Sequence, residues 1–222
     1  MSKIGYIRVS TEHQETARQQ EKLDENYIES HYHVDPDRVT TVKNGYEYSG
    51  LDSVYQDFKQ FWNWAMSANM SDPSNYRRVC DTLDINGLID FVAFENYIAN
   101  WDCMINSNNW MIWRADESDG SNPYTDGKWR FLLFDTEYSS GYDGQCSFRR
   151  DCFKDMDKSG RITSISSLFN KLMSNNEFKQ QFFSEPNDEE RKKLNRYAHF
   201  RMTGATRSPL LALEYLQEHG LK

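Results

Sequence analysis

The residues of this sequence best suited to chemistry are carboxylates and amides that fall within one stretch, residues 94–141. One carboxylate is followed within seven residues by several asparagines, and two further acidic residues come after an apolar run. The candidates are Asp102, Asn106, Asn108, Asn109, Asp135 and Glu137. Carboxylate and amide oxygens bind hard divalent cations, and a carboxylate beside a hydroxyl group can accept its proton. The stretch therefore predicts a site at which a divalent cation and a phosphorylated substrate meet.

Two apolar, aromatic-rich runs lie between these groups, at residues 110–114 and 129–134, and both are typical of β-strands. The link between them, residues 116–127, is rich in turn-forming residues. We expect an antiparallel hairpin, whose two-residue period decides where each end points. Its base would bring the loop that carries Asp102 and Asn109 beside the later acidic pair.

Three helices are predicted ahead of this hairpin. Residues 51–66 carry apolar side chains at helical intervals, Asp72 caps a second helix that begins with a proline, and a third helix follows Asp84. The face of the third helix is marked by Leu88, Phe91, Val92, Glu95 and Ile98. This helix would deliver Asp102 at its C-terminal end. A short strand, residues 38–42, precedes an Asn-Gly turn, so the fold class is a helix-rich α+β.

The order of these features matches a known pattern. Protein kinases place a catalytic Asp, an Asn several residues later, a short hairpin and a metal-binding Asp in that order. The ordinary kinase motifs His-Arg-Asp and Asp-Phe-Gly are absent. The sequence instead resembles the CotH family of atypical spore-coat protein kinases over residues 25–187. The resemblance rests on Asn100-Trp101-Asp102, on Asn109 with the apolar run after it, and on Phe134-Asp135-Thr136-Glu137.

The resemblance implies a kinase C-lobe-like domain whose hairpin flanks a metal site. Asp102 would be the catalytic base, with Asn109 and Asp135 as ligands of Mg²⁺. Asn109 lies seven residues after Asp102 rather than five, so Asn106 and Asn108 remain alternative ligands. Glu137 stands where the family usually has a second Asp, and this longer carboxylate would reach the metal ion through water. The competing interpretation is that these residues only cap helices and end strands.

A kinase must also hold its nucleotide, and neither Gly-x-Gly-x-x-Gly nor Gly-Lys-Ser/Thr occurs in the chain. CotH family members are typically longer, with nucleotide-binding groups ahead of the matched region, so we expect a truncated domain. Lys43 is the nearby candidate for a phosphate-binding lysine. The resemblance implies transfer of the γ-phosphoryl group of ATP, with Mg²⁺ as cofactor, to Ser or Thr of a protein substrate. We expect activity to be weak or absent in this chain alone, and the alternative is a non-catalytic protein-interaction module.

The first segment, residues 1–24, differs from the rest. Its strand-like opening with Arg8 and Ser10 resembles the N-terminus of resolvase/invertase serine recombinases. That resemblance implies that Ser10 attacks DNA and that Arg8 binds the phosphate, which makes a recombinase-derived DNA-binding or strand-exchange protein a second alternative. The further arginines that such a nucleophile needs are missing downstream, so we expect Ser10 to cap a helix. The two resemblances together suggest a chimeric chain.

The composition of the chain limits which partners, cellular location and metal sites we expect. Residues 188–222 form a basic segment with a short amphipathic helix, yet the whole chain has a formal charge of −8, which makes nucleic acid an unlikely partner. No apolar run has the length of a membrane span or of a secretory signal, so we expect a cytoplasmic protein without membrane contact. The four cysteines lack Cys-x-x-Cys spacing, which argues against a zinc site, and Cys103 beside Asp102 is expected to be a packed thiol.

Overall fold

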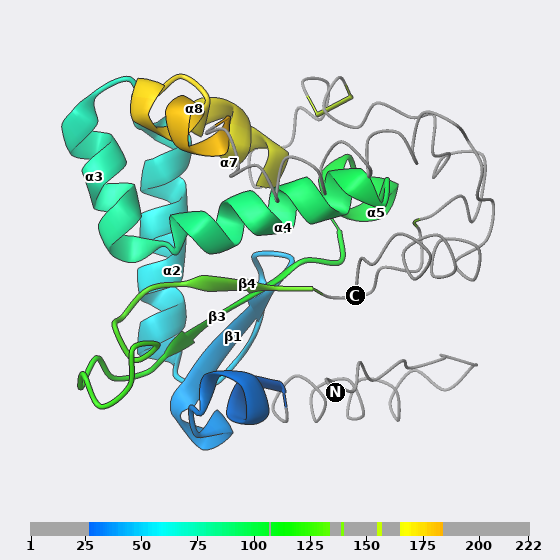
Figure 1. Ribbon diagram of the computed structural model, residues 1–222. Helices are drawn as coiled ribbons and strands as arrows, with labels where there is room; N and C mark the ends of the chain where they lie inside the picture. The colour runs from blue at the N-terminus through cyan, green and yellow to red at the C-terminus, as the bar shows by residue number, and fades with distance from the viewer. Residues whose placement is uncertain (1–26, 107, 134–138, 140–154, 157–164, 184–222) are drawn as a thin grey trace, which may run out of the picture.

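The structure is a computed structural model of the 222-residue chain, and it describes residues 27–106, 108–133, 139, 155–156 and 165–183. The elements are a π-helix η1 (Ile28–Tyr32), a 3₁₀ helix η2 (Pro36–Arg38), strands β1 (Val39–Lys43), β2 (Glu47–Ser49), β3 (Met111–Ala115) and β4 (Arg130–Leu132), and helices α2 (Asp52–Ser67), α3 (Pro73–Thr82), α4 (Ile85–Tyr97), α5 (Trp101–Met104), α7 (Ile165–Leu172) and α8 (Asn176–Phe182). The fold is α+β, as predicted (Figure 1).

The four strands form one antiparallel sheet in the order β2-β1-β3-β4. The predicted hairpin is confirmed, because β3 pairs with β4 and Met111 lies opposite Leu132. Strand β1 pairs with the other edge of β3, and there Lys43 lies opposite Met111. The β1 pairing was not predicted, since sequence periodicity shows which residues share a face but not which strands are neighbours.

Strands β1, β3 and β4 are largely buried on both faces of the sheet, whereas the edge strand β2 is exposed. Side chains of one face, which include Val42, Trp110 and Ile112, join the main core with helices α2, α3, α4, α7 and α8. Side chains of the other face, which include Met111 and Trp113, join a smaller core with Ile28, Val34 and Val39 from the first described segment. Figure 1 shows the helices on one side of the sheet and η1 on the other. Continuous apolar runs such as that of β3 fit this two-sided burial.

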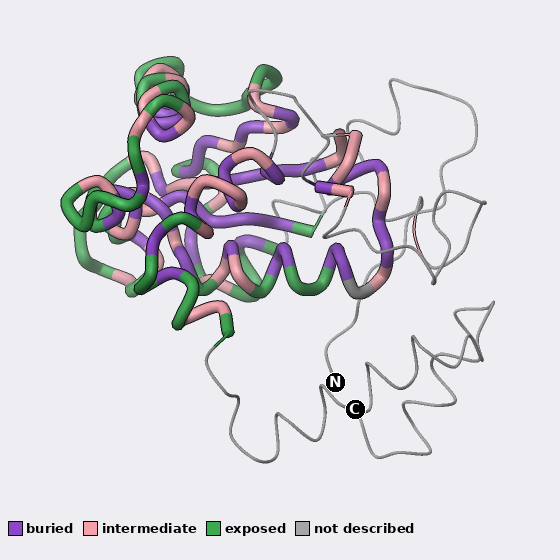
Figure 2. Tube along the Cα trace, turned by 90° about the horizontal axis from the view of Figure 1, so that it is seen from above, coloured by how far each residue is buried: buried purple, intermediate pink, exposed green. Residues whose placement is uncertain are grey.

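The helices follow the periodicity of the sequence. The buried residues of α2 are Val54, Tyr55, Phe58, Phe61, Trp62 and Ala65. Asp72 accepts a hydrogen bond from the backbone N–H of Ser74 at the start of α3, and Asp84 accepts one from Gly87 at the start of α4. Buried and exposed residues alternate along α4, the long helix at the lower side of the coloured part of Figure 2. Among the described residues, no helix combines the length and the apolar character that crossing a bilayer requires.

Candidate functional site

The Asp102 carboxylate is the centre of a ring of amide groups. Asn106 Nδ2 donates to Asp102 Oδ1 over 2.8 Å, and Asn109 Nδ2 donates to Asp102 Oδ2 over 2.7 Å. Asn108 Nδ2 lies 3.4 Å from the same Oδ2, and its backbone N–H donates to the carbonyl oxygen of Asp102. Hydrogen bonds to an ionised acceptor are among the stronger ones in proteins. The structure therefore brings together Asp102 and all three of the asparagines proposed as ligands.

A change of direction in the backbone sets the position of Asp102. The sequence suggested that α4 itself delivers this residue, but α4 ends at Tyr97 and Ala99 has a left-handed φ of 55°. A separate short helix, α5, then begins, and Asn100 caps it by accepting from the Cys103 N–H over 3.3 Å. Asp102 thus lies in the first turn of its own helix, where the helix dipole favours a negative charge.

The loop between α5 and β3 is anchored from the β1–β2 turn. Asn109 has a φ of 54°, a left-handed conformation in which asparagine is enriched. The next residue, Trp110, donates its backbone N–H to Asn44 Oδ1 over 3.3 Å, and its carbonyl oxygen accepts from the Asn44 N–H over 2.9 Å. The Trp110 ring is fully buried and stacks on Trp62, with ring centroids 5.2 Å apart. Asn109 therefore leads directly into the main core.

Lys43, the proposed phosphate-binding lysine, lies at the same end of the sheet. It is the last residue of β1 and faces Met111, two residues after Asn109. Because side chains alternate along a strand, Lys43 belongs to the face of Met111, whereas Val42 belongs to the main core. The structure thus brings the backbone of Lys43 near the start of β3, and its role toward a phosphate stays a prediction.

Asp135 and Glu137 lie outside the described residues, so their part in a metal site also stays a prediction. Within the described ranges, no group of three His, Cys, Asp or Glu side chains is placed to hold a metal ion. The arrangement of the asparagine side chains around Asp102 nevertheless fits the prediction that Asn109 is a metal ligand. An ionised Asp102 can only accept hydrogen bonds, so Asn109 must donate its Nδ2, which leaves the Oδ1 atom as a possible ligand for a hard cation.

Two further ionisable side chains, Glu95 and Cys103, lie near the start of α5. Glu95 of α4 is fully buried, and burial raises its carboxyl pKa to about 8, while the neighbouring Asn100 amide acts in the opposite direction. Burial also raises the pKa of the Cys103 thiol, as do the negative charges of Glu95 and Asp102. Cys103 is therefore a packed thiol, as predicted, because a neutral thiol is a poor nucleophile. The apolar spacing of α4 indicated that Glu95 faces inward, but not that it lacks a partner.

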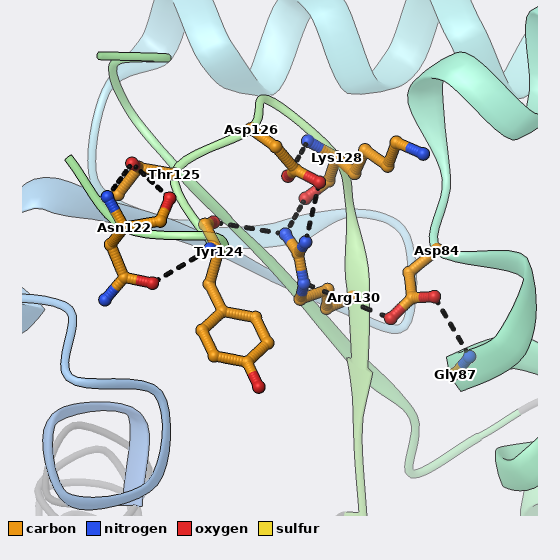
Figure 3. Close-up of polar contacts among 8 residues, drawn as sticks. All are labelled: Asp84, Gly87, Asn122, Tyr124, Thr125, Asp126, Lys128 and Arg130. Carbon is orange, nitrogen blue, oxygen red and sulfur yellow. Dashed lines mark hydrogen bonds and ion pairs between the residues drawn. The ribbon is translucent and has the colours of Figure 1, made fainter. Parts of the chain in front are cut away.

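A second polar cluster surrounds Arg130 (Figure 3), which sequence reasoning did not single out. Its guanidinium group forms an ion pair with Asp126 over 2.9 Å, and its Nε lies 4.0 Å from the carboxylate of Asp84. One of its terminal nitrogens also donates to the carbonyl oxygens of Tyr124 and Lys128. Since Asp84 caps α4, this buried arginine ties the long link of the hairpin to the helix that leads to the site.

The α+β fold agrees with the fold class that the sequence predicted. A family model described as CotH kinase protein matches residues 9–205, so the chain belongs to the CotH family. The match is wider than the predicted residues 25–187. It includes most of the segment that resembles serine recombinases, a resemblance that this comparison does not support, and Arg8 and Ser10 lie outside the described residues. Searches of curated proteins and of solved structures found no match.

Proposed function

We propose that this chain is a CotH-like protein kinase that transfers the γ-phosphoryl group of ATP to a Ser or Thr hydroxyl group of a protein. The observation that carries the proposal is the Asp102 carboxylate, held on both oxygens by side-chain amides of the loop that leads into β3. A fixed carboxylate of this kind can orient a hydroxyl group and accept its proton as the new bond to phosphorus forms. Membership of the CotH family supports the same chemistry.

Magnesium-bound ATP would supply the phosphoryl group and the charge neutralisation when bound. In the chain, Asn109 would present its Oδ1 while its Nδ2 stays bonded to Asp102, so one side chain would couple the base to the cation. Asp135 would be the second ligand. It follows Leu132 by three residues, a length of chain that spans at most about 10 Å, and Leu132 lies opposite Met111 at the start of β3. Glu137 would act through water, and Lys43 would approach a phosphate.

Phosphotransfer to casein and to the chain itself, followed with radiolabelled ATP and Mg²⁺, tests the proposal. We expect weak turnover that Asp102→Ala lowers by at least about 100-fold, the usual contribution of a general base. Asp135→Ala should lower it as well, because it removes a proposed ligand of the cation that neutralises the phosphates. Glu117→Ala is the matched control, because Glu117 is an exposed carboxylate with a 73% exposed side chain on the hairpin link. Turnover that neither site variant changes would overturn the assignment of the site.

One observation favours a second candidate, a non-catalytic interaction module of the same fold. Asp102 is only 8% exposed, and both of its oxygens already accept hydrogen bonds, which is what a purely structural carboxylate would show. Calorimetric titration with Mg-ATP separates the two functions. A kinase should release heat that Lys43→Gln and Asn109→Gly reduce, whereas a module that does not use nucleotide should give none.

A further inference from the structure

A carboxyl group with no visible function in the site is enclosed between α4 and α5. Glu95 has no exposed surface, and neither of its oxygens meets a hydrogen-bond donor in good geometry among the described residues. It continues the buried face formed by Leu88, Phe91 and Val92. A buried polar group without a partner costs free energy, so a glutamate in this position calls for an explanation.

Among the described residues, the group that acts on the Glu95 carboxyl group is the Asn100 side chain, at the start of the Asp102 loop. The backbone N–H of Asn100 donates to the Glu95 carbonyl oxygen over 2.9 Å. The Nδ2 group of Asn100 is also buried without a partner in good geometry, while its Oδ1 atom accepts from Cys103. On α5 the Cys103 thiol senses the charges of both Glu95 and Asp102, and no cation of the described part of the chain acts on the Glu95 carboxyl group.

These contacts form a short path from α4 to the site. Glu95 lies against Asn100, Asn100 caps α5, and α5 carries Asp102 in its first turn. We propose that Glu95 is a positioning residue for Asp102. The carboxyl group of Glu95 supports the Asn100 cap, and this cap sets the direction in which α5 presents the Asp102 carboxylate. This inference rests on the proposed function, because Asp102 has a reacting role only there.

The protonation state of Glu95 decides how well it does this. Because burial holds its pKa near 8, the group is neutral at lower pH and can both donate to and accept from an amide. Above that pH it becomes a buried negative charge beside Asn100 and close to the Cys103 thiol of α5, and it can then only accept hydrogen bonds. Proton loss from Glu95 should therefore shift the Asn100 cap and, through it, the amide ring around Asp102.

NMR spectra of the full chain with ¹⁵N-labelled asparagine test the inference without any need for activity. We expect the side-chain amide signals of Asn100, Asn106 and Asn109 to move with one common midpoint near pH 8. In Glu95→Gln, which keeps the size and hydrogen-bonding capacity of the neutral acid, the signals should stay at their low-pH positions. Glu117→Gln, at an exposed carboxylate, should titrate like wild type.

Two results would overturn the inference. One is a midpoint near pH 8 that persists in Glu95→Gln. The other is movement of the Asn100 signal alone, since Glu95 would then support the cap without reaching Asp102. If Glu95→Gln does not fold, the wild-type titration still decides, because signals without a common midpoint contradict the proposed path.

Kinetics separate a failure of this inference from a failure of the proposed function. With casein and Mg-ATP, wild-type kcat should fall above pH 8, by at most about tenfold for each pH unit, because one proton is lost from Glu95, while the KM for Mg-ATP stays constant. Glu95→Gln should keep its kcat over this range, and Glu95→Ala should lose it at every pH. Common amide titration without any phosphotransfer would contradict kinase activity and support the positioning role. Phosphotransfer with identical pH profiles in wild type and Glu95→Gln would contradict the positioning role alone.

Discussion

Asn109 donates from Nδ2 to Asp102 Oδ2 over 2.7 Å, and it does so from a backbone conformation with a φ of 54°. The hydrogen bond requires the side-chain amide of Asn109, whereas the positive φ favours a residue that tolerates the left-handed conformation. Asn109→Gly removes the amide but tolerates the left-handed conformation, whereas Asn109→Ala removes the amide and adds strain of about 1 kcal/mol. We expect the alanine variant to be less stable than the glycine variant by about that amount in urea denaturation.

Both variants should weaken Mg-ATP binding equally in calorimetry, because both lack the amide oxygen. The comparison thus separates stability from ligand binding at one position. A glycine variant that is less stable than the alanine variant would show that the backbone of Asn109 is not the constraint.

Glu95 should make the stability of the wild-type chain depend on pH. Burial raises its pKa from about 4.5 to about 8, so the folded state binds more protons than the unfolded state between these values. The stabilisation is fully present below about pH 4.5, and it is lost as the pH rises through 8. The shift corresponds to a ceiling of about 5 kcal/mol over this window. Glu95→Gln should remove that part of the pH dependence.

The measurement is the difference in unfolding free energy between Glu95→Gln and wild type from pH 5 to pH 9. This difference should grow in favour of the variant as the pH rises. Other titrating groups cancel in the comparison, and Glu117→Gln should show a constant difference over the same range. A difference between Glu95→Gln and wild type that does not change with pH would mean that Glu95 ionises normally in the folded chain.

The sequence predicted the parts of the fold that follow from local periodicity. The apolar spacing of residues 51–66 became α2, and the two aromatic runs became the β3–β4 hairpin. The cap at Asp72 and the start of a helix after Asp84 were also predicted correctly, since a side chain that accepts from the first turn is a local feature.

The parts that sequence could not predict depend on contacts between distant segments. The pairing of β1 with β3 joins distant segments of the chain, and so do the bonds from Asn44 to Trp110, which lie 66 positions apart. The three asparagines were open alternatives in the sequence, and the structure shows that all of them contact Asp102, because α5 turns its carboxylate into the loop that follows. No pattern of residue types distinguishes such an arrangement from a single ligand at one spacing.

Arg130 should be far more important for stability than the exposed arginines. Its side chain is 7% exposed, and it forms the ion pair with Asp126 as well as bonds to two carbonyl oxygens (Figure 3). Burial tends to raise the pKa of Asp126, but the bonds from Arg130 and from the Lys128 N–H hold it below its usual value. Arg130→Met leaves these acceptors without their donor, so we expect a loss of about 3 kcal/mol in unfolding free energy.

Arg38 is the matched control, because it pairs with Glu117 and Asp119 over 3.0 Å while its own side chain is 49% exposed. Arg38→Met should cost at most about 1 kcal/mol in the same denaturation experiment. Equal losses for the two variants would contradict a special role for the buried arginine.

Gly50, just before α2, packs closely against the backbone and the Thr40 side chain of β1. Its φ is 108°, and a Cβ atom there would lie 2.5 Å from Thr40 Oγ1 and 2.7 Å from the Val39 carbonyl oxygen. Thr40 cannot move aside easily, because its hydroxyl group donates to Asp116 and accepts from the Leu51 N–H. Gly50→Ala thus combines backbone strain with a clash against backbone, and we expect a loss of about 3 kcal/mol or more.

Gly120 is the control for strain alone, since its φ is 66° and nothing lies within 4 Å of a Cβ atom at that position. Gly120→Ala should cost only about 1 kcal/mol, the usual penalty of a left-handed alanine. Unfolding free energies from urea titrations of the two variants give the clash contribution directly, as their difference. If Gly50→Ala proved as stable as Gly120→Ala, then β1 and the start of α2 would not be in contact through Thr40 as the structure shows.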